Sequence, residues 1–234
     1  MHKIDLPKDV VERVAARRGR RHAFDPIEPA RTALLVVDLQ NYFMEPGQAC
    51  EVPFAREIVP NVNGLARATR AAGGAVVWIR MTQSPEEMKR WSVFYGALNT
   101  KARGTEEMHR LSEGDHGHAL WPTLETENGD LYVPKRRFSA FIQGSSGLEA
   151  TLRARGIDTV IVTGTTTNTC CQATALDAMM LDFKVIFVAD ATATFTDAAH
   201  NAVLANVLNC FGDVRMTTEV IALLETSGTR AAAE

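Results

Sequence analysis

Three residues of different chemical types each follow a short apolar run, and together they could carry out nucleophilic chemistry. Asp38 ends one run, Lys135 directly follows a second, and Cys170 lies a few residues beyond a third. A cysteine is a nucleophile as its thiolate, a carboxylate can accept and return a proton, and an ammonium group can hold the negative charge. Such a set would suit attack of sulfur on a carbonyl carbon.

Each of these residues also has a purely structural interpretation. Asp38 could satisfy loop N–H groups, Lys135 could belong to a solvated basic turn, and Cys170 could pack as a small hydrophobe. Cys171 is a rival nucleophile, but one helical step rotates it by about 100° from its neighbour, so only one of the two can face a common crevice.

The segment around Cys170 predicts a strand, a turn, a helix and a second strand in unbroken order. Thr159–Thr163 and Lys184–Ala189 are β-branched runs typical of strands buried on both faces. Between them, apolar residues recur at helical spacing over Thr169–Leu181, and residues that favour N-caps precede a helix start at Cys170. A cysteine in the first helical turn would meet unpaired N–H groups and the macrodipole, which favour a thiolate and a lowered thiol pKa.

The remaining runs extend the same alternation of strands and helices along the chain. Further strands are predicted at 32–38, 75–80, 130–134 and 213–217, and further helices at 55–72, 146–155, 196–210 and 218–224. This pattern predicts a single α/β domain with one doubly wound, mostly parallel six-stranded sheet in the order 3-2-1-4-5-6 and helices on both faces. The carboxyl ends of parallel strands share one edge, so Asp38, Lys135 and the turn before Cys170 should meet there.

Three segments fall outside or interrupt this pattern. We expect residues 1–31 to form an N-terminal arm with a short helix ended by Gly19, residues 32–226 to form the domain, and residues 227–234 to form a frayed tail. Residues 86–128 mix aromatic side chains with charges and glycines and are predicted to be an insertion. The arm could dock on the domain, dock on a neighbouring subunit, or remain a disordered basic tail.

Composition limits the classes of partner and the compartment. The 234 residues are 46% hydrophobic, with a net charge of −3, which offers no bulk attraction to nucleic acid or to an anionic membrane. The apolar runs are strand-sized, well short of the roughly 18 to 20 residues that a membrane helix needs. Four cysteines, two of them adjacent, form no disulfide framework. We therefore expect a cytoplasmic protein with a small-molecule partner.

Three motifs resemble the signatures of the isochorismatase-like cysteine hydrolases, which include nicotinamidases and N-carbamoylsarcosine, ureidoacrylate and biuret hydrolases. The motifs are DLQNYF, PKRRFSAF and GTTTNTCCQATALDA. The resemblance implies that Asp38 is the catalytic acid and base, Lys135 the catalytic lysine and Cys170 the nucleophile. It also implies an oxyanion hole made by the backbone N–H groups of Cys170 and Thr166, the latter after a cis peptide bond to Thr165.

The resemblance implies a function and a set of partners. The expected activity is cysteine-dependent hydrolysis of a C–N bond in a small amide or ureide, through a thioester, with release of ammonia or an amine. Phe43 falls where relatives line the pocket, and Arg80 could anchor a carboxylate of the substrate. We expect a homodimer or homotetramer.

The metal site of related nicotinamidases has no counterpart in this sequence. Those enzymes carry an Asp and two His, one commonly in a D-W-H stretch after the second strand, where this chain has WIRMTQSPEEM. No histidine occurs between His22 and His109, and DHGH at 115–118 is interpreted as a solvated loop. We therefore predict neither a metal nor any other cofactor.

Other classes of function fit less well. VTGTTTNT matches neither the G-x-G-x-x-G fingerprint nor a P-loop. A redox sensor that uses Cys170 and Cys171 as a vicinal pair, or a small-ligand-binding protein on the same fold, remains an alternative to the hydrolase.

Overall fold

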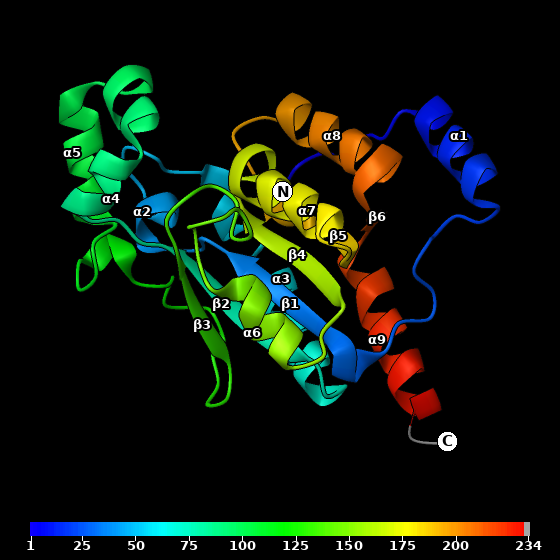
Figure 1. Cartoon of the computed structure of the whole chain (residues 1–234). Coiled ribbons are helices and arrows are strands. Elements are labelled where there is room, and N and C mark those ends of the chain that lie inside the picture. Colours follow the sequence, from blue (N-terminus) through cyan, green and yellow to red (C-terminus); the bar gives the residue numbers. More distant parts are fainter. Residues whose placement is uncertain (232–234) are drawn as a thin grey trace.

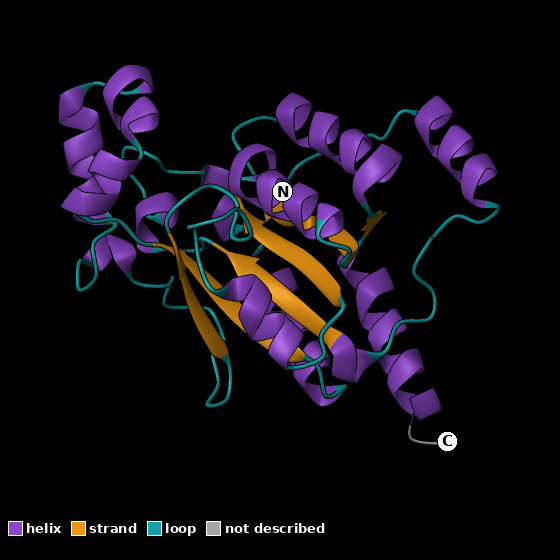
Figure 2. Cartoon of the chain, in the orientation of Figure 1, coloured by secondary structure: helices purple, strands orange, loops and turns teal. Residues whose placement is uncertain are grey.

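A computed structural model describes residues 1–231 of the chain, built around one six-stranded, all-parallel sheet (Figures 1 and 2). Its strands are β1 Thr32–Val37, β2 Ala75–Met81, β3 Leu131–Lys135, β4 Thr159–Thr165, β5 Lys184–Ala193 and β6 Asp213–Arg215. Their order is β3-β2-β1-β4-β5-β6, so the predicted topology is confirmed.

Helices cover both faces of the sheet (Figure 1). The α-helices of the described residues are α1 Lys8–Arg18, α2 Asn41–Met44, α3 Val59–Ala71, α4 Pro85–Arg90, α5 Lys101–Arg110, α6 Leu148–Ala154, α7 Gln172–Met180, α8 Asp197–Asn206 and α9 Thr217–Ala231. Helices α6, α7 and α8 pack on one face, and α3 and α9 pack on the other. Among the described residues, no helix is both long and apolar enough to cross a bilayer.

The central strand β1 shows why its sequence is apolar without alternation. All six of its residues are buried, with Leu35 and Val37 in the core under α6 and α7, and Leu34 and Val36 in the core under α3. A strand covered on both faces gains from apolar residues at every position. The sheet edge beyond Val37 is consequently held rigidly from both sides.

The helix that carries Cys170 begins earlier than predicted. A wide helical turn spans Thr167–Cys171 and leads directly into α7, so the predicted start at Cys170 is wrong by three residues. The prediction ended the preceding strand at Thr163 because glycine usually interrupts a strand. Here Gly164 adopts φ +107° and β4 keeps pairing through Thr165.

The N-terminal arm docks on the domain of its own chain. Helix α1 ends as predicted at Gly19, which is left-handed with φ 68°. The Arg18 guanidinium lies 2.8 Å from the fully buried carboxylate of Asp213 on β6, which also accepts from the backbone N–H groups of Ala23 and Phe24. The docked arm rules out the disordered-tail alternative for this structure.

The other expected irregular segments are partly helical. Within 86–128, helices α4 and α5 and a wide turn at Val93–Leu98 project beyond the sheet next to α2 (Figure 1). At the other end of the chain, α9 continues to Ala231, so most of the expected tail extends this helix. Residues 232–234 of that predicted tail lie outside the described residues.

The close approach of β4 to β1 generates a stability prediction at Gly164. A Cβ at this position would overlap the backbone oxygen of Val37, and the φ of +107° is unfavourable for any side chain. Gly164→Ala should therefore lower the free energy of unfolding by roughly 3 kcal/mol or more. The matched control is Gly156→Ala, where φ is +71° but no atom lies within 4 Å, so only about 1 kcal/mol should be lost. Urea unfolding of both variants measures the difference, and equal losses would contradict the steric argument.

Candidate active site

Asp38 occupies the first position beyond β1, in a backbone conformation that directs its carboxylate across the sheet edge. Its φ is +50°, uncommon for a residue other than glycine, and its N–H donates to the carbonyl of Ile79. Asp38 Oδ1 accepts a 2.9 Å hydrogen bond from the N–H of Met81. The adjacent strand β2 therefore fixes one carboxylate oxygen and leaves the other facing Lys135.

Lys135 is the last residue of β3, and its ammonium group joins the other two predicted residues. Lys135 Nζ lies 2.8 Å from Asp38 Oδ2, 3.4 Å from Cys170 Sγ and 3.1 Å from the carbonyl oxygen of Arg137. Lys135 is 0% exposed and Asp38 is 1% exposed. The structure thus brings Asp38, Lys135 and Cys170 into one buried group.

The two adjacent cysteines face different surroundings. Cys170 is 6% exposed and contacts Lys135, whereas Cys171 is fully buried with its Sγ 3.7 Å from the carbonyl oxygen of Thr163. Both thiols are free. One helical step therefore separates a thiol beside the ammonium from a thiol in the core, as expected from the rotation.

Burial and the neighbouring charges set the protonation of this group. Burial raises the pKa of the Cys170 thiol, Lys135 lowers it by less, and the Asp38 carboxylate adds to the rise. Burial alone would lower the pKa of Lys135, but Asp38 and Cys170 raise it above its ordinary value. The expected lowering of the thiol pKa is thus wrong for this structure, because desolvation outweighs the lysine.

One oxygen of Asp38 retains acceptor capacity. Asp38 Oδ2 is buried beside the ammonium of Lys135, yet among the described residues no well-aligned hydrogen bond reaches it. A carboxylate oxygen has two lone pairs, so this atom can still accept a proton from a neighbouring thiol.

Thr166, whose N–H was expected in an oxyanion hole, lies in the turn between β4 and Cys170. The peptide bond between Thr165 and Thr166 is cis. The carbonyl oxygen of Thr166 accepts from the N–H groups of Thr169 and Cys171. Thr165 Oγ1 donates to the carbonyl of Ala193 on β5. This turn is therefore tied both to the helical segment after it and to the neighbouring strand.

The two expected substrate contacts lie in different places. Phe43 on α2 packs against the core that contains Cys170. Arg80 is not brought to the triad, because alternation along β2 places it on the face of Trp78, and its guanidinium lies 5.9 Å from the Tyr132 ring centroid. Arg80 therefore lies apart from Asp38, Lys135 and Cys170, and its expected role as a substrate anchor stays a prediction.

The DHGH segment differs from the expected solvated loop. His116 is exposed and lies 3.2 Å from Glu45, but His118 is buried, with Nε2 2.9 Å from Thr82 Oγ1. Burial lowers the pKa of His118. The prediction is wrong for His118 because the 3₁₀ turn packs it against the loop after β2. Within the part of the chain that the structure describes, no three His, Cys, Asp or Glu side chains form a group that could hold a metal ion.

Sequence reasoning missed two side chains that adjoin the triad. The sulfur of Met81 lies 3.9 Å from Lys135 Nζ and 3.2 Å from Gln83 Nε2, and the Gln83 amide oxygen is buried without a hydrogen-bond partner among the described residues. Their position at the end of β2 and just after it, at the same sheet edge as Asp38, was the available signal.

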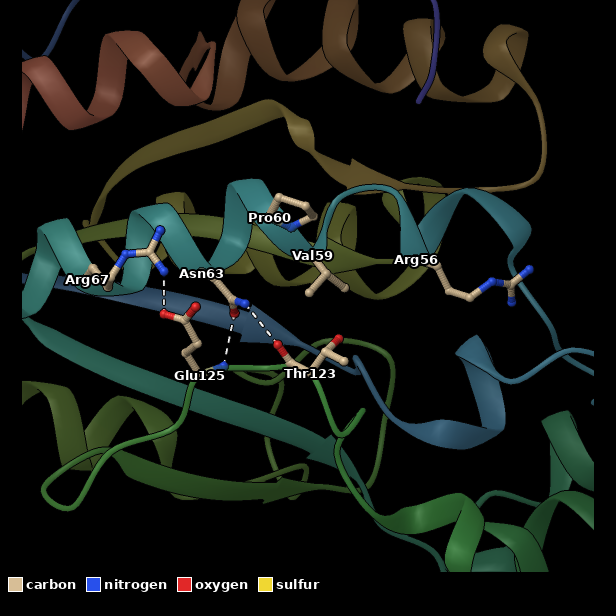
Figure 3. Close-up of a pocket in the computed structure, with 7 residues that line it drawn as sticks. All are labelled: Arg56, Val59, Pro60, Asn63, Arg67, Thr123 and Glu125. Atoms are coloured by element: carbon tan, nitrogen blue, oxygen red, sulfur yellow. Dashed lines mark hydrogen bonds and ion pairs between the residues drawn. The ribbon is translucent and has the colours of Figure 1, made fainter.

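A separate hollow of about 400 Å³ lies against α3, and Asp38, Lys135 and Cys170 are not among the residues that line it (Figure 3). Its lining residues are Arg56, Val59, Pro60, Asn63, Arg67, Thr123 and Glu125. The polar side chains pair with one another: Arg67 forms an ion pair with Glu125, and Asn63 bonds the backbone of Thr123 and Glu125. With these groups already satisfied, the hollow lacks the reactive set found beside Cys170.

Comparison with known proteins shows to which family the chain belongs. Residues 32–219 match the isochorismatase domain. The chain is 32% identical over 200 residues to the ureidoacrylate amidohydrolase RutB of Methylobacterium radiotolerans, covering 80% of this chain and 76% of that protein. It also resembles the crystal structure of a cysteine hydrolase from Pseudomonas syringae pv. phaseolicola, with a TM-score of 0.75 and 31% identity over 86% of this chain and 96% of the other. N-carbamoylsarcosine amidase from Thermoplasma acidophilum has a TM-score of 0.64 at 26% identity, covering 80% and 96% of the two chains. The chain therefore belongs to the isochorismatase family of hydrolases.

Proposed function

We propose that this protein is a cysteine-dependent amidohydrolase that cleaves a C–N bond of a small amide or ureide. The observation that carries the proposal is the position of Lys135 Nζ, within contact distance of both the Asp38 carboxylate and the Cys170 sulfur. A nucleophile, a proton acceptor and a cation in one buried group are the parts that covalent hydrolysis of a carbonyl compound requires.

The proposed reaction begins from a neutral thiol. Cys170 Sγ attacks the substrate carbonyl carbon while Asp38 takes the thiol proton, and the C–O π electrons move to oxygen. The N–H groups of Cys170 and Thr166 would hold this oxyanion. The C–N bond then breaks, Asp38 returns the proton to the leaving nitrogen, and a thioester remains. Water then gives a proton to Asp38 and attacks the thioester carbonyl, the C–S bond breaks, and the carboxylic or carbamic acid is released. Asp38 returns its proton to the departing sulfur, which restores the Cys170 thiol.

Relatives support the substrate class. Two proteins that this chain resembles are named for ureidoacrylate and N-carbamoylsarcosine, which makes a ureide or carbamoyl compound the best candidate. Phe43 would line the substrate pocket. The enzyme would act in the cytoplasm as a homodimer or homotetramer. Residues 1–31 and 86–128 would be additions to the core domain. Ammonia release should be fastest with a ureide in a screen of nicotinamide, carbamoylsarcosine, ureidoacrylate, maleamate and biuret.

The two cysteines offer a matched pair of variants. Cys170→Ala should abolish turnover, because no other group beside Lys135 can form the thioester. Cys171→Ala removes a core thiol and should retain most turnover, with a loss of about 1 kcal/mol in stability. Steady-state ammonia release measures both. Normal activity in Cys170→Ala would exclude the proposed nucleophile, and loss only in Cys171→Ala would transfer that role to Cys171.

The ion pair can be separated into its catalytic and structural parts. Asp38→Asn should lower kcat by about 10³-fold or more, because an amide can neither accept nor return the thiol proton. Lys135→Met should also inactivate, and it should lower the free energy of unfolding by about 3 kcal/mol because it leaves a buried carboxylate unpaired.

The double variant is the control for this pair. Asp38→Asn with Lys135→Met removes both charges, so stability in urea should recover toward wild type while activity stays absent. A double variant as unstable as Lys135→Met would show that packing, rather than the unpaired charge, causes the loss.

Metal removal tests the remaining requirement of the proposal. Because the described residues form no group able to ligate a metal, dialysis against EDTA should leave kcat unchanged. Zinc added back to the dialysed enzyme is the control. Activity lost with EDTA and restored by zinc would contradict the metal-independent mechanism and direct attention to His116 and His118.

A further inference from the structure

The N-terminal arm contacts residues that support the turn before Cys170. His2 is 7% exposed, and its Nε2 lies 3.0 Å from the N–H of Thr194, directly after β5. Because a backbone N–H can only donate, Nε2 must be the acceptor, so the imidazole proton resides on Nδ1. Nδ1 lies 2.8 Å from Asp197 Oδ1 and donates to it.

The His2 ring also contacts a second buried histidine. It stacks on His200 of α8, with ring centroids 4.4 Å apart and planes at 19°. His200 is fully buried, and its Nδ1 lies 3.0 Å from Thr167 Oγ1. Burial lowers the pKa of His200 to about 4, so this ring is neutral at physiological pH.

Thr194 connects the arm to the same turn by another route. Its N–H donates to His2, and its hydroxyl donates a 2.6 Å hydrogen bond to Asn168 Oδ1. Thr194 and Thr167 are both 0% exposed, so neither has a water molecule at its surface as a ready alternative partner. His2 thus contacts two residues that support the turn at 165–168: Thr194, which bonds Asn168, and His200, which bonds Thr167.

We infer that His2 is a positioning residue for the active site: through Thr194 and His200 it holds residues 165–168 so that the Thr166 N–H points at the developing oxyanion. This inference rests on the proposed function, since it concerns the oxyanion hole of that reaction. It assigns the arm a part in turnover, although the hydrogen bonds that the described residues make to Lys135 and Cys170 come from outside the arm.

Turnover should be sensitive to this support. Loss of a whole oxyanion donor costs roughly 10² to 10³-fold in kcat, and small misplacements of catalytic groups cost part of that. The N–H of Thr166 would be displaced rather than lost when His2 is changed. We therefore expect kcat to fall by about 10-fold with KM little altered, because the ground-state carbonyl depends less on this donor than the oxyanion does.

Three substitutions at one position separate the contacts of His2. In His2→Gln the amide oxygen can reach the place of Nε2 and accept from Thr194, so kcat should stay within about twofold of wild type. In His2→Asn the shorter amide can replace only Nδ1 and its bond to Asp197, so kcat should fall about 10-fold. His2→Ala should fall at least as far.

Hydrogen exchange supplies a readout that does not depend on turnover. The amides of Thr194 and of residues 165–168 should exchange faster in His2→Asn and His2→Ala and remain protected in His2→Gln. Wild-type kcat in His2→Asn and His2→Ala would overturn the inference, as would an equal loss in all three variants, which would show that the imidazole ring rather than the Thr194 hydrogen bond is required. A wild-type enzyme inactive on every amide and ureide would instead refute the proposed function, whatever the exchange pattern.

Discussion

The structure depends on satisfying one buried ammonium group. Lys135 has no exposed surface, and a charge in that position is strongly destabilising without partners. Besides the sulfur of Met81, it contacts Asp38, Cys170 and the carbonyl of Arg137, and these three partners follow three separate strands. Only a sheet whose parallel strands end at one edge, with β1 between β2 and β4, brings them together. The strand order of the sheet and the pairing of Lys135 at its edge therefore depend on each other.

Strand order could be predicted from the alternation of strands and helices, whereas the catalytic roles expected of Asp38, Lys135 and Cys170 came from the resemblance of their motifs to a family and stay a prediction. Apolar runs without alternation mark strands covered on two faces, and parallel strands place whatever follows them at a common edge. The start of the helix before Cys170 could not be predicted in this way. Gly164 usually signals the end of a strand, but here its positive φ lets β4 continue, and only the contact with Val37 in a neighbouring strand reveals this.

Some features of the structure depend on burial and on which face of a strand a side chain occupies, and residue types alone do not encode these. Arg80 and Met81 are adjacent, yet alternation places Met81 near Lys135 and Arg80 on the opposite face of the sheet. The sequence left open whether the charged arm docks on its own domain, docks on a neighbouring subunit or stays disordered. Two polar contacts dock it on its own domain: Arg18 pairs with the buried Asp213, and His2 accepts from the buried N–H of Thr194. Such pairing over more than 190 positions along the chain has no local signature.

In the proposed reaction, the raised pKa of the Cys170 thiol would determine how the nucleophile forms. A site holding Asp38 as carboxylate, Lys135 as ammonium and Cys170 as thiol has no net charge, which suits a buried position. If the Cys170 thiol lost its proton to solvent, the buried group would carry a net negative charge. Moving its proton to Asp38 leaves the total charge of the group unchanged, with Lys135 still paired to one anion. In the proposed reaction, burial would therefore favour a thiolate that exists only while Asp38 holds the proton, so that sulfur attack would be coupled to proton transfer.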